Sequence, residues 1–136
     1  MNRILKFTFL MFVSVAVFGC NNSKPSKTIT QFGEINVISP ADFKEKSANH
    51  TIIDVRTPGE FSEGHIEGAI NINFFDKNFL EQMAKFNTNE PVFIYCKSGN
   101  RSSSAIKKMS DLGFVQVNEL QGGILNWQKS NQPIIK

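Results

Sequence analysis

Several residue types that would mark a specialised protein class are scarce in this sequence. Among 136 residues there are only two cysteines, one tryptophan and one tyrosine. Two cysteines cannot build a framework of several disulfides, and the absence of a Cys-x-x-Cys pair disfavours a thiol–disulfide oxidoreductase. The hydrophobic share of 40% and charged share of 20% exclude disordered and fibrous classes, and the length indicates a single domain.

A strong charge of either sign is also missing. The formal net charge is +3, and residues 1–19 contain Arg3 and Lys6 but no acid. Without that segment, 13 basic and 12 acidic side chains remain. A nucleic-acid-binding protein needs a concentrated basic face, and no run of this chain supplies one. We therefore expect no nucleic-acid partner.

No apolar run is long enough to span a membrane. The N-terminal run, residues 7–18, has twelve residues and follows Arg3 and Lys6. As a helix it would measure about 18 Å, well below the hydrocarbon thickness of about 30 Å. Its length and basic flank are typical of a secretory signal. The sequence thus predicts a signal peptide over residues 1–19.

The end of that segment, residues 17–20 (VFGC), resembles the lipobox of bacterial lipoproteins. In that family the cysteine receives a diacylglycerol and becomes the new N-terminus. The resemblance implies lipidation at Cys20, a polar tether over residues 20–32 with no period that could build a core, and a domain over residues 33–136. It places the domain in the bacterial cell envelope, anchored to a membrane, in the periplasm or outside the cell.

One position departs from the lipobox pattern, because Phe18 stands where a small residue is usual. An ordinary secretory signal with Cys20 present by chance is one alternative. A cytoplasmic protein with an N-terminal anchor helix is the other.

The remainder of the chain alternates predicted strands and helices. Strands are expected at residues 35–38, 51–55, 70–72, 91–95 and 114–117. A helix is expected to begin after Ser39 as N-cap, with Pro40 as its first residue. Further helices are expected over 75–86, with one buried stripe, over 102–112 and over 124–129. Residues 57–69 carry three glycines and a proline and are expected to be mainly loop. This alternation predicts an α/β fold with a mostly parallel central sheet and helices on both faces.

Cys96 occupies the position where open α/β sheets bind their ligands, directly after a predicted buried strand and before a helix. The loop behind it contains Ser, Gly and Asn, which allow backbone N–H groups to converge. Converging amides and a helix dipole form an anion site and favour thiolate over thiol, and Lys97 and Arg101 add positive charge. The pattern predicts a nucleophilic thiolate in an anion-binding loop. The alternative is an inert buried cysteine.

Three segments in order resemble the rhodanese family. Residues 96–102 (CKSGNRS) resemble its active-site loop with the pattern Cys-x-x-Gly-x-Arg. The other matching segments are 53–61 (IDVRTPGEF) with 64–72 (GHIEGAINI), and 120–124 (LQGGI) with Trp127. The resemblance extends over about residues 33–132.

This resemblance implies the rhodanese fold and a sulfurtransferase reaction. Such enzymes take a sulfane sulfur from an anionic donor such as thiosulfate onto the cysteine as a persulfide and pass it to cyanide, a thiol or a protein acceptor. Backbone N–H groups can stabilise the persulfide anion, so no metal and no cofactor are expected. The loop residues expected to bind donor and persulfide are Lys97, Ser98, Gly99, Asn100, Arg101 and Ser102.

Asp54 and Arg56, at the end of the predicted strand 51–55, admit two interpretations. They support the site electrostatically, or they form a structural network in which Arg56 pairs with Glu60 and Asp54 holds loop backbone. His65 lies in the signature turn and is expected to be structural.

Two alternatives to sulfur transfer stay open. Phosphatases and arsenate reductases related to rhodanese use Cys-x5-Arg, with the arginine six positions after the cysteine to grip phosphate. Here Arg101 is five positions after Cys96. A non-catalytic binding or sensing module is the second alternative, although such domains often lack the cysteine that this chain keeps.

Overall fold

The structure, a computed structural model, describes residues 24–30 and 33–136. The predicted signal peptide over residues 1–19 and the predicted lipid at Cys20 lie outside these residues. The strands are β1 (Ser26–Thr30), β2 (Gly33–Ile38), β3 (Thr51–Asp54), β4 (Ala69–Asn71), β5 (Val92–Tyr95) and β6 (Gln116–Leu120). The helices are α1 (Pro40–Lys46), α2 (Pro58–Glu63), α3 (Phe79–Met83), α4 (Asn100–Lys108), the 3-10 turn η1 (Ser110–Leu112) and α5 (Gly123–Lys129).

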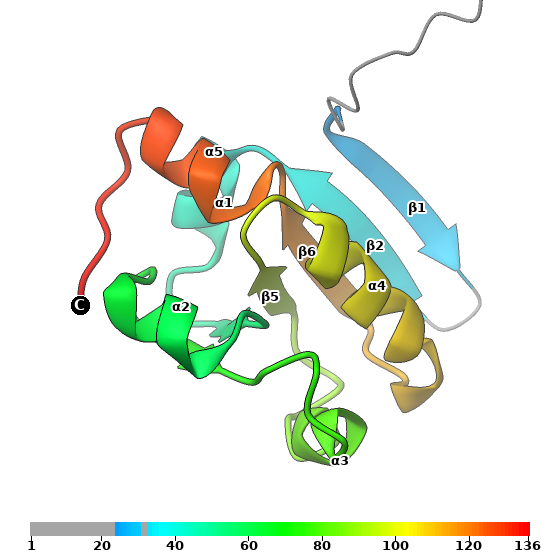
Figure 1. Cartoon of the computed structure of the whole chain (residues 1–136). Coiled ribbons are helices and arrows are strands. Elements are labelled where there is room, and N and C mark those ends of the chain that lie inside the picture. The colour runs from blue at the N-terminus through cyan, green and yellow to red at the C-terminus, as the bar shows by residue number, and fades with distance from the viewer. Residues whose placement is uncertain (1–23, 31–32) are drawn as a thin grey trace, which may run out of the picture.

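Six strands form one sheet in the order β1-β2-β6-β5-β3-β4 (Figure 1). Every neighbouring pair is parallel except β1 and β2, which are antiparallel. The sheet is therefore mostly parallel, as the alternation of strands and helices predicted. Strand β5 lies between β6 and β3, so the residue that follows β5 emerges near the middle of the sheet edge.

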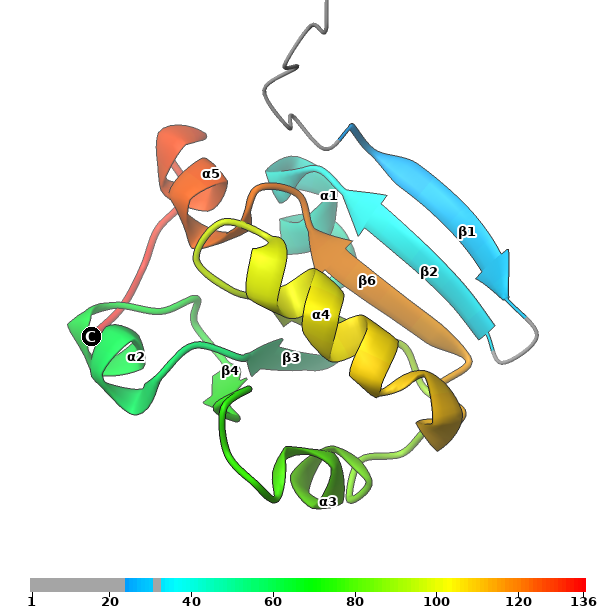
Figure 2. The same cartoon turned by 45° about the vertical axis from the view of Figure 1, so that its right-hand side comes forward.

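Helices cover both faces of this sheet, and each face has its own apolar core. Figure 2 shows α4 lying across the face nearer the viewer. On that side Ile94 packs with α3 and α4 side chains such as Met83 and Ala105. On the opposite side Phe93 and Tyr95 pack in the cluster that contains α1 and α5 side chains. Alternate residues of β5 thus face opposite cores, as the period of two in a strand requires.

The helix start expected at Ser39 is confirmed. The Ser39 side chain accepts a hydrogen bond from the Asp42 N–H at 3.2 Å, and Pro40 is the first helical residue of α1. The expectation of a loop over residues 57–69 is wrong for its first half, where α2 forms. Pro58 begins α2, and Thr57 and Glu60 form a reciprocal capping box that satisfies the first backbone N–H groups.

Two predicted helices have different lengths in the structure. The helix expected over 75–86 is reduced to α3, Phe79–Met83, with Phe79 and Met83 fully buried. Phe75 is excluded because the Asn73 side chain accepts a hydrogen bond from the Phe75 N–H and holds a turn, and 64% of Phe75 is exposed. The helix expected over 102–112 begins two residues earlier, at Asn100.

The tether predicted over residues 20–32 needs a correction, because its described part contains strand β1. Strand β1 pairs antiparallel with β2 from Ser26 opposite Val37 to Thr30 opposite Gly33. Its side chains are mostly exposed, so backbone hydrogen bonds rather than an apolar pattern hold it at the sheet edge. No helix within the described part of the chain is long and apolar enough to cross a membrane.

Candidate active site

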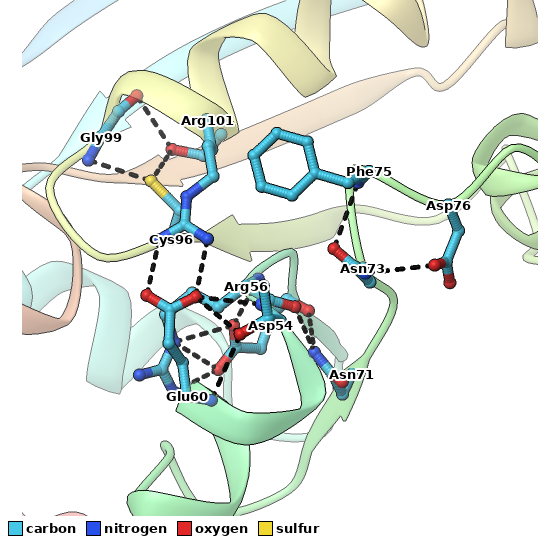
Figure 3. Close-up of polar contacts among 12 residues, drawn as sticks. Asp54, Arg56, Glu60, Asn71, Asn73, Phe75, Asp76, Cys96, Gly99 and Arg101 are labelled. Carbon is cyan, nitrogen blue, oxygen red and sulfur yellow. Dashed lines mark hydrogen bonds and ion pairs between the residues drawn. The ribbon is translucent and has the colours of Figure 1, made fainter.

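Cys96 directly follows β5, and helix α4 begins four residues later. The residue is 1% exposed. Its Sγ accepts a hydrogen bond from the Gly99 N–H at 3.1 Å, and the Ser102 Oγ lies 3.4 Å from the same sulfur (Figure 3). The structure therefore brings three of the predicted site residues, Cys96, Gly99 and Ser102, into contact.

The backbone of Gly99 makes this contact possible. Its φ is +104°, a conformation that residues with a Cβ rarely adopt. Because Gly99 is also the residue before the first turn of α4, its N–H points back toward the sulfur. Position 99 of the loop therefore needs glycine, because the backbone conformation that aims this N–H at the sulfur has a positive φ.

The remaining loop residues form the outer surface of the loop. Lys97, Ser98 and Asn100 are exposed, and no recorded hydrogen bond of the described residues joins their side chains to Sγ. Lys97 lines a cavity of about 230 Å³ together with Arg56 and Glu60. The structure thus places Lys97 at the cavity and not against the sulfur, which Gly99 and Ser102 contact. Attraction of an anionic donor by Lys97 stays a prediction.

Helix α5 holds the loop from behind. The Ile124 N–H donates to the Cys96 carbonyl at 2.9 Å, and the Leu125 N–H donates to the Lys97 carbonyl at 3.2 Å. Gly123 has φ +63°, and a Cβ there would stand about 2.5 Å from the Lys97 carbonyl carbon and oxygen. The first turn of α5 can approach the loop this closely only with glycine at this position.

Arg101 is bound to helix α2. Its two Nη atoms donate to the two carboxylate oxygens of Glu60, each at 2.7 Å. This bidentate pair lowers the pKa of Glu60 to about 2 and raises the pKa of Arg101. The Arg101 guanidinium also lies 5.8 Å from the centre of the Phe75 ring (Figure 3). Sequence reasoning missed both partners, although the Thr-x-x-Glu spacing of the capping box marked Glu60 as a placed residue.

The second ion pair, Asp54 with Arg56, is buried beneath α2. The Arg56 backbone N–H donates to the Asp54 carboxylate at 2.9 Å, and its Nη2 does so at 2.6 Å. Burial opposes the charge of Arg56, but Asp54 outweighs it and holds the pKa of the guanidinium above its usual value. The expected role of Asp54 in holding loop backbone is confirmed, whereas the expected pairing of Arg56 with Glu60 is wrong. Electrostatic support of the reaction by this pair stays a prediction.

A buried acid that sequence reasoning did not identify lies behind α4. Glu119 of β6 is 6% exposed, and its Oε1 accepts hydrogen bonds from the Ser102 Oγ at 2.6 Å and the Ser103 Oγ at 2.8 Å. Burial raises the pKa of this carboxyl above its usual value. Val117 packs in the core on the α4 side of the sheet, and Glu119, two residues later in the same strand, faces the same side. This spacing is the sequence signal that could have located Glu119.

His65 lies just after α2, in the turn where it was expected. Its Nδ1 is 3.0 Å from the Phe61 carbonyl oxygen, its ring stacks on Phe61 at 3.8 Å, and its backbone pairs with Ile135. These contacts join the end of α2 to the C-terminal segment, which is a structural role for His65. Across residues 24–30 and 33–136, no group of three or more His, Cys, Asp or Glu side chains could hold a metal ion.

Comparison with known proteins agrees with this geometry. The sequence profile of the family described as "Rhodanese-like domain" matches residues 39–130. The chain belongs to the rhodanese family. "Thiosulfate sulfurtransferase 16, chloroplastic" of Arabidopsis thaliana is 36% identical to this chain over 96 residues, covering 63% of this chain and 80% of that protein.

Other curated relatives are similar over comparable lengths of this chain. "Thiosulfate sulfurtransferase GlpE" of Shewanella oneidensis is 31% identical over 80 residues, which are 59% of this chain and 77% of that protein. "Probable adenylyltransferase/sulfurtransferase MoeZ" of Mycobacterium tuberculosis is 37% identical over 92 residues and covers 68% of this chain. The match spans only 24% of that longer protein.

Solved structures share the fold. A rhodanese-related protein from Thermoplasma volcanium superposes with a TM-score of 0.65 at 30% identity, covering 73% of this chain and 96% of that one. A rhodanese-like domain protein from Staphylococcus aureus gives a TM-score of 0.58 at 28% identity, covering 67% and 89%. The predicted rhodanese fold is confirmed.

Proposed function

We propose that this rhodanese domain is a sulfurtransferase that moves a sulfane sulfur through a persulfide on Cys96. The donor is thiosulfate or a related anion, and the acceptor is a thiol, cyanide or a protein. The observation that carries the proposal is the position of Cys96 Sγ on the floor of the loop, with the Gly99 N–H donating to it at 3.1 Å. Relatives named as thiosulfate sulfurtransferases support the same reaction class.

The reaction needs only groups that the chain provides. The Cys96 thiolate attacks the outer sulfur of thiosulfate, a new S–S bond forms, and sulfite leaves with the electrons of the broken bond. The acceptor then attacks the outer sulfur of the persulfide, and the Cys96 thiolate leaves. The Gly99 N–H and the N-terminal turn of α4 stabilise the sulfur anion in both steps, and the charge of Arg101 acts on the same sulfur.

Intact mass spectrometry of the full chain tests this proposal directly. Incubation with thiosulfate is expected to add one sulfur atom at Cys96, and cyanide is expected to remove it as thiocyanate. Cys96→Ser is expected to take up none, while Cys20→Ala, the matched change at the other cysteine, keeps the uptake. An unchanged parent mass with thiosulfate and with other sulfane donors would favour the binding or sensing module instead.

The arrangement of Arg101 disfavours the phosphatase alternative. A phosphate-binding loop uses its arginine to hold the phosphate through two parallel N–H groups. In this chain both Nη atoms of Arg101 already donate to Glu60, which turns the guanidinium toward α2. Together with the shorter spacing between Cys96 and Arg101, this supports sulfur transfer over phosphate hydrolysis.

We also propose that Cys20 carries a lipid that anchors the protein in the bacterial cell envelope. The support is the sequence of residues 1–20: a basic start, a short apolar run and the Gly19-Cys20 pair. Two or more acyl chains anchor a protein stably where a single chain is marginal. Cys20→Ala is expected to block lipid processing and membrane retention, measured by mass spectrometry of the N-terminus and by membrane fractionation. A native Cys20–Cys96 disulfide, or a mature N-terminus without acyl groups, would contradict this assignment.

A further inference from the structure

Glu119 is a buried titratable group that the proposed reaction does not use. It is 6% exposed, and no ion pair recorded for the described residues includes it. Its carboxylate is connected to the reactive sulfur through one residue, because the Ser102 Oγ lies 2.6 Å from Glu119 Oε1 and 3.4 Å from Cys96 Sγ. Ser102 itself is fully buried, so bulk water does not compete for its hydroxyl.

The single hydrogen of the Ser102 hydroxyl has three acceptors within reach: Glu119 Oε1 at 2.6 Å, the Gly99 carbonyl oxygen at 3.1 Å and Cys96 Sγ at 3.4 Å. It cannot serve all of them at once. When Glu119 is ionised, the short contact at 2.6 Å is a charge-assisted hydrogen bond to the carboxylate. The sulfur then faces an oxygen lone pair, which suits a neutral S–H donor. When Glu119 is protonated, the carboxyl donates to the Ser102 oxygen, and the Ser102 hydrogen turns to an anionic sulfur in preference to the neutral Gly99 carbonyl, because a charged acceptor makes the stronger hydrogen bond. The two negative charges therefore oppose each other through Ser102.

Among the described residues, the hydrogen-bond partners of Glu119 are uncharged, whereas Cys96 also interacts with the charge of Arg101. The neighbouring strands place Val37 and Ile94 opposite Glu119 in register, and neither is charged. Helix α4 contributes Ser103, whose hydroxyl donates to the same carboxylate oxygen at 2.8 Å. The charged group that acts on Cys96 from α4 is Arg101, which is itself paired with Glu60 of α2.

We propose that Cys96 and Glu119 share one proton through Ser102, so that Glu119 is protonated whenever the sulfur is anionic. In the first step the thiol hydrogen passes to the Ser102 oxygen while the Ser102 hydrogen passes to Glu119. A neutral thiol, a carboxylate and thiosulfate thus give an anionic persulfide, a carboxylic acid and sulfite, with no proton released to solvent. When the acceptor removes the outer sulfur, the proton returns along the same path.

This sharing makes Glu119 a positioning residue that acts on the sulfur through Ser102 rather than by touching the substrate. It keeps the buried charge of the site constant during turnover, because one negative charge moves between sulfur and carboxylate. The raised pKa of Glu119 is in keeping with this role, since it brings the proton affinity of the carboxyl closer to that of a thiol. The inference rests on the proposed function for the use of the persulfide.

Infrared difference spectroscopy of the full chain tests the shared proton. The persulfide form minus the iodoacetamide-alkylated form, in which the sulfur is neutral, is expected to show one protonated carboxyl gained and one carboxylate lost. Glu119→Gln is expected to lack this signal. Ser103→Ala is the matched control, because it removes a hydrogen bond to the same carboxylate oxygen but lies outside the path, and it is expected to keep the signal. Absence of the signal in the parent persulfide would overturn the proposal.

A second measurement needs no sulfur donor, so it separates failure of the shared proton from failure of the proposed function. The rate of Cys96 alkylation by iodoacetamide is followed against pH. In Glu119→Gln the opposing carboxylate is gone, and the alkylation profile is expected to move to lower pH by about one unit or more. Ser103→Ala is expected to move it much less. A profile in Glu119→Gln that only changes height, with the same pH midpoint as the parent, would show a structural role for Glu119 and refute the coupling.

Discussion

Two carboxyl groups flank the loop of Cys96, and their environments drive their pKa values apart. Glu60 on α2 faces the Arg101 guanidinium, and its pKa is lowered to about 2. Glu119 on β6 accepts hydrogen bonds from the hydroxyls of Ser102 and Ser103, and burial raises its pKa. The difference shows that a paired cation outweighs partial burial on one side, while hydroxyl partners do not offset nearly complete burial on the other.

Helix α4 separates these two environments. Arg101 and Ser102 are consecutive residues in its first turn, and successive helical residues point about 100° apart. One therefore reaches α2 and the other reaches β6. The Arg101–Glu60 ion pair thus lies on one side of α4, and the buried acid Glu119 lies on the other.

Among these predictions, the largest effect is expected on enzymatic activity when the Arg101 cation is removed. Arg101→Ala leaves the Glu60 carboxylate unpaired beside the loop, where it repels an anionic donor, and removes the positive charge that acts on Cys96. We expect kcat/KM for thiosulfate to fall about tenfold, which corresponds to about 1.4 kcal/mol. Steady-state sulfur transfer to cyanide measures this. Arg101→Lys, which keeps the charge but loses the two-point contact, should fall between parent and alanine variant. An alanine variant as active as the parent would remove Arg101 from donor capture.

Neutralising Glu60 tests the same pair from the other side through its pH dependence. Because the folded pKa of Glu60 is depressed, its contribution to stability is present above pH 4.5 and is lost as the pH falls toward about 2. Glu60→Gln, which can keep the capping box with Thr57, should cost about 1 kcal/mol or less at pH 6 and should flatten the acid loss. Thermal melts from pH 2 to 7 measure both. Equal acid sensitivity in the two proteins would contradict the pairing.

The contribution of Glu119 to the free energy of unfolding is expected to depend on pH in the opposite direction to that of Glu60. It is also the smallest of the effects predicted here. Because its folded pKa is raised, the contribution of Glu119 is fully present below pH 4.5 and is lost as the pH rises through the folded value. Glu119→Gln should therefore raise the free energy of unfolding at pH 8, by less than about 1 kcal/mol, and leave it unchanged at pH 4. Chemical denaturation at the two pH values checks this. A loss of stability at pH 8 alone would show that the carboxylate is favourably bound when ionised.

Much of this architecture was predictable from local pattern. The apolar, β-branched strand around Ile53 and the apolar run before Cys96 specify buried parallel strands, and Ser39 with Pro40 specifies a helix start. The misjudged segments lack such signals. In α2 the proline and glycines resemble a loop until the capping box is recognised, and β1 is held mainly by backbone pairing that no side-chain pattern records.

The candidate site divides in the same way. Cys96, the glycine at position 99 and the arginine at position 101 lie within six residues, so their proximity follows from the chain itself, and a helix start after a strand brings amides to the thiol. Partners from distant segments could not be assigned. The sequence did not indicate which acid pairs with Arg101, and it led us to expect Arg56 to pair with Glu60. The positions of α2 and β3 in the fold decide both pairs.

By itself, then, the sequence determined most of the alternation of strands and helices, although not α2 or β1. It also determined the place of Cys96 after a buried strand and the amide-rich loop that follows it, because these depend on residues close together along the chain. Only the tertiary structure decided which carboxyl meets a cation and which is buried among hydroxyls. Glu60 lies 41 residues from Arg101, and Glu119 lies 17 residues from Ser102. At such separations, the packing of α2 and β6 against α4 sets the distances, and the distances set the charge of each group.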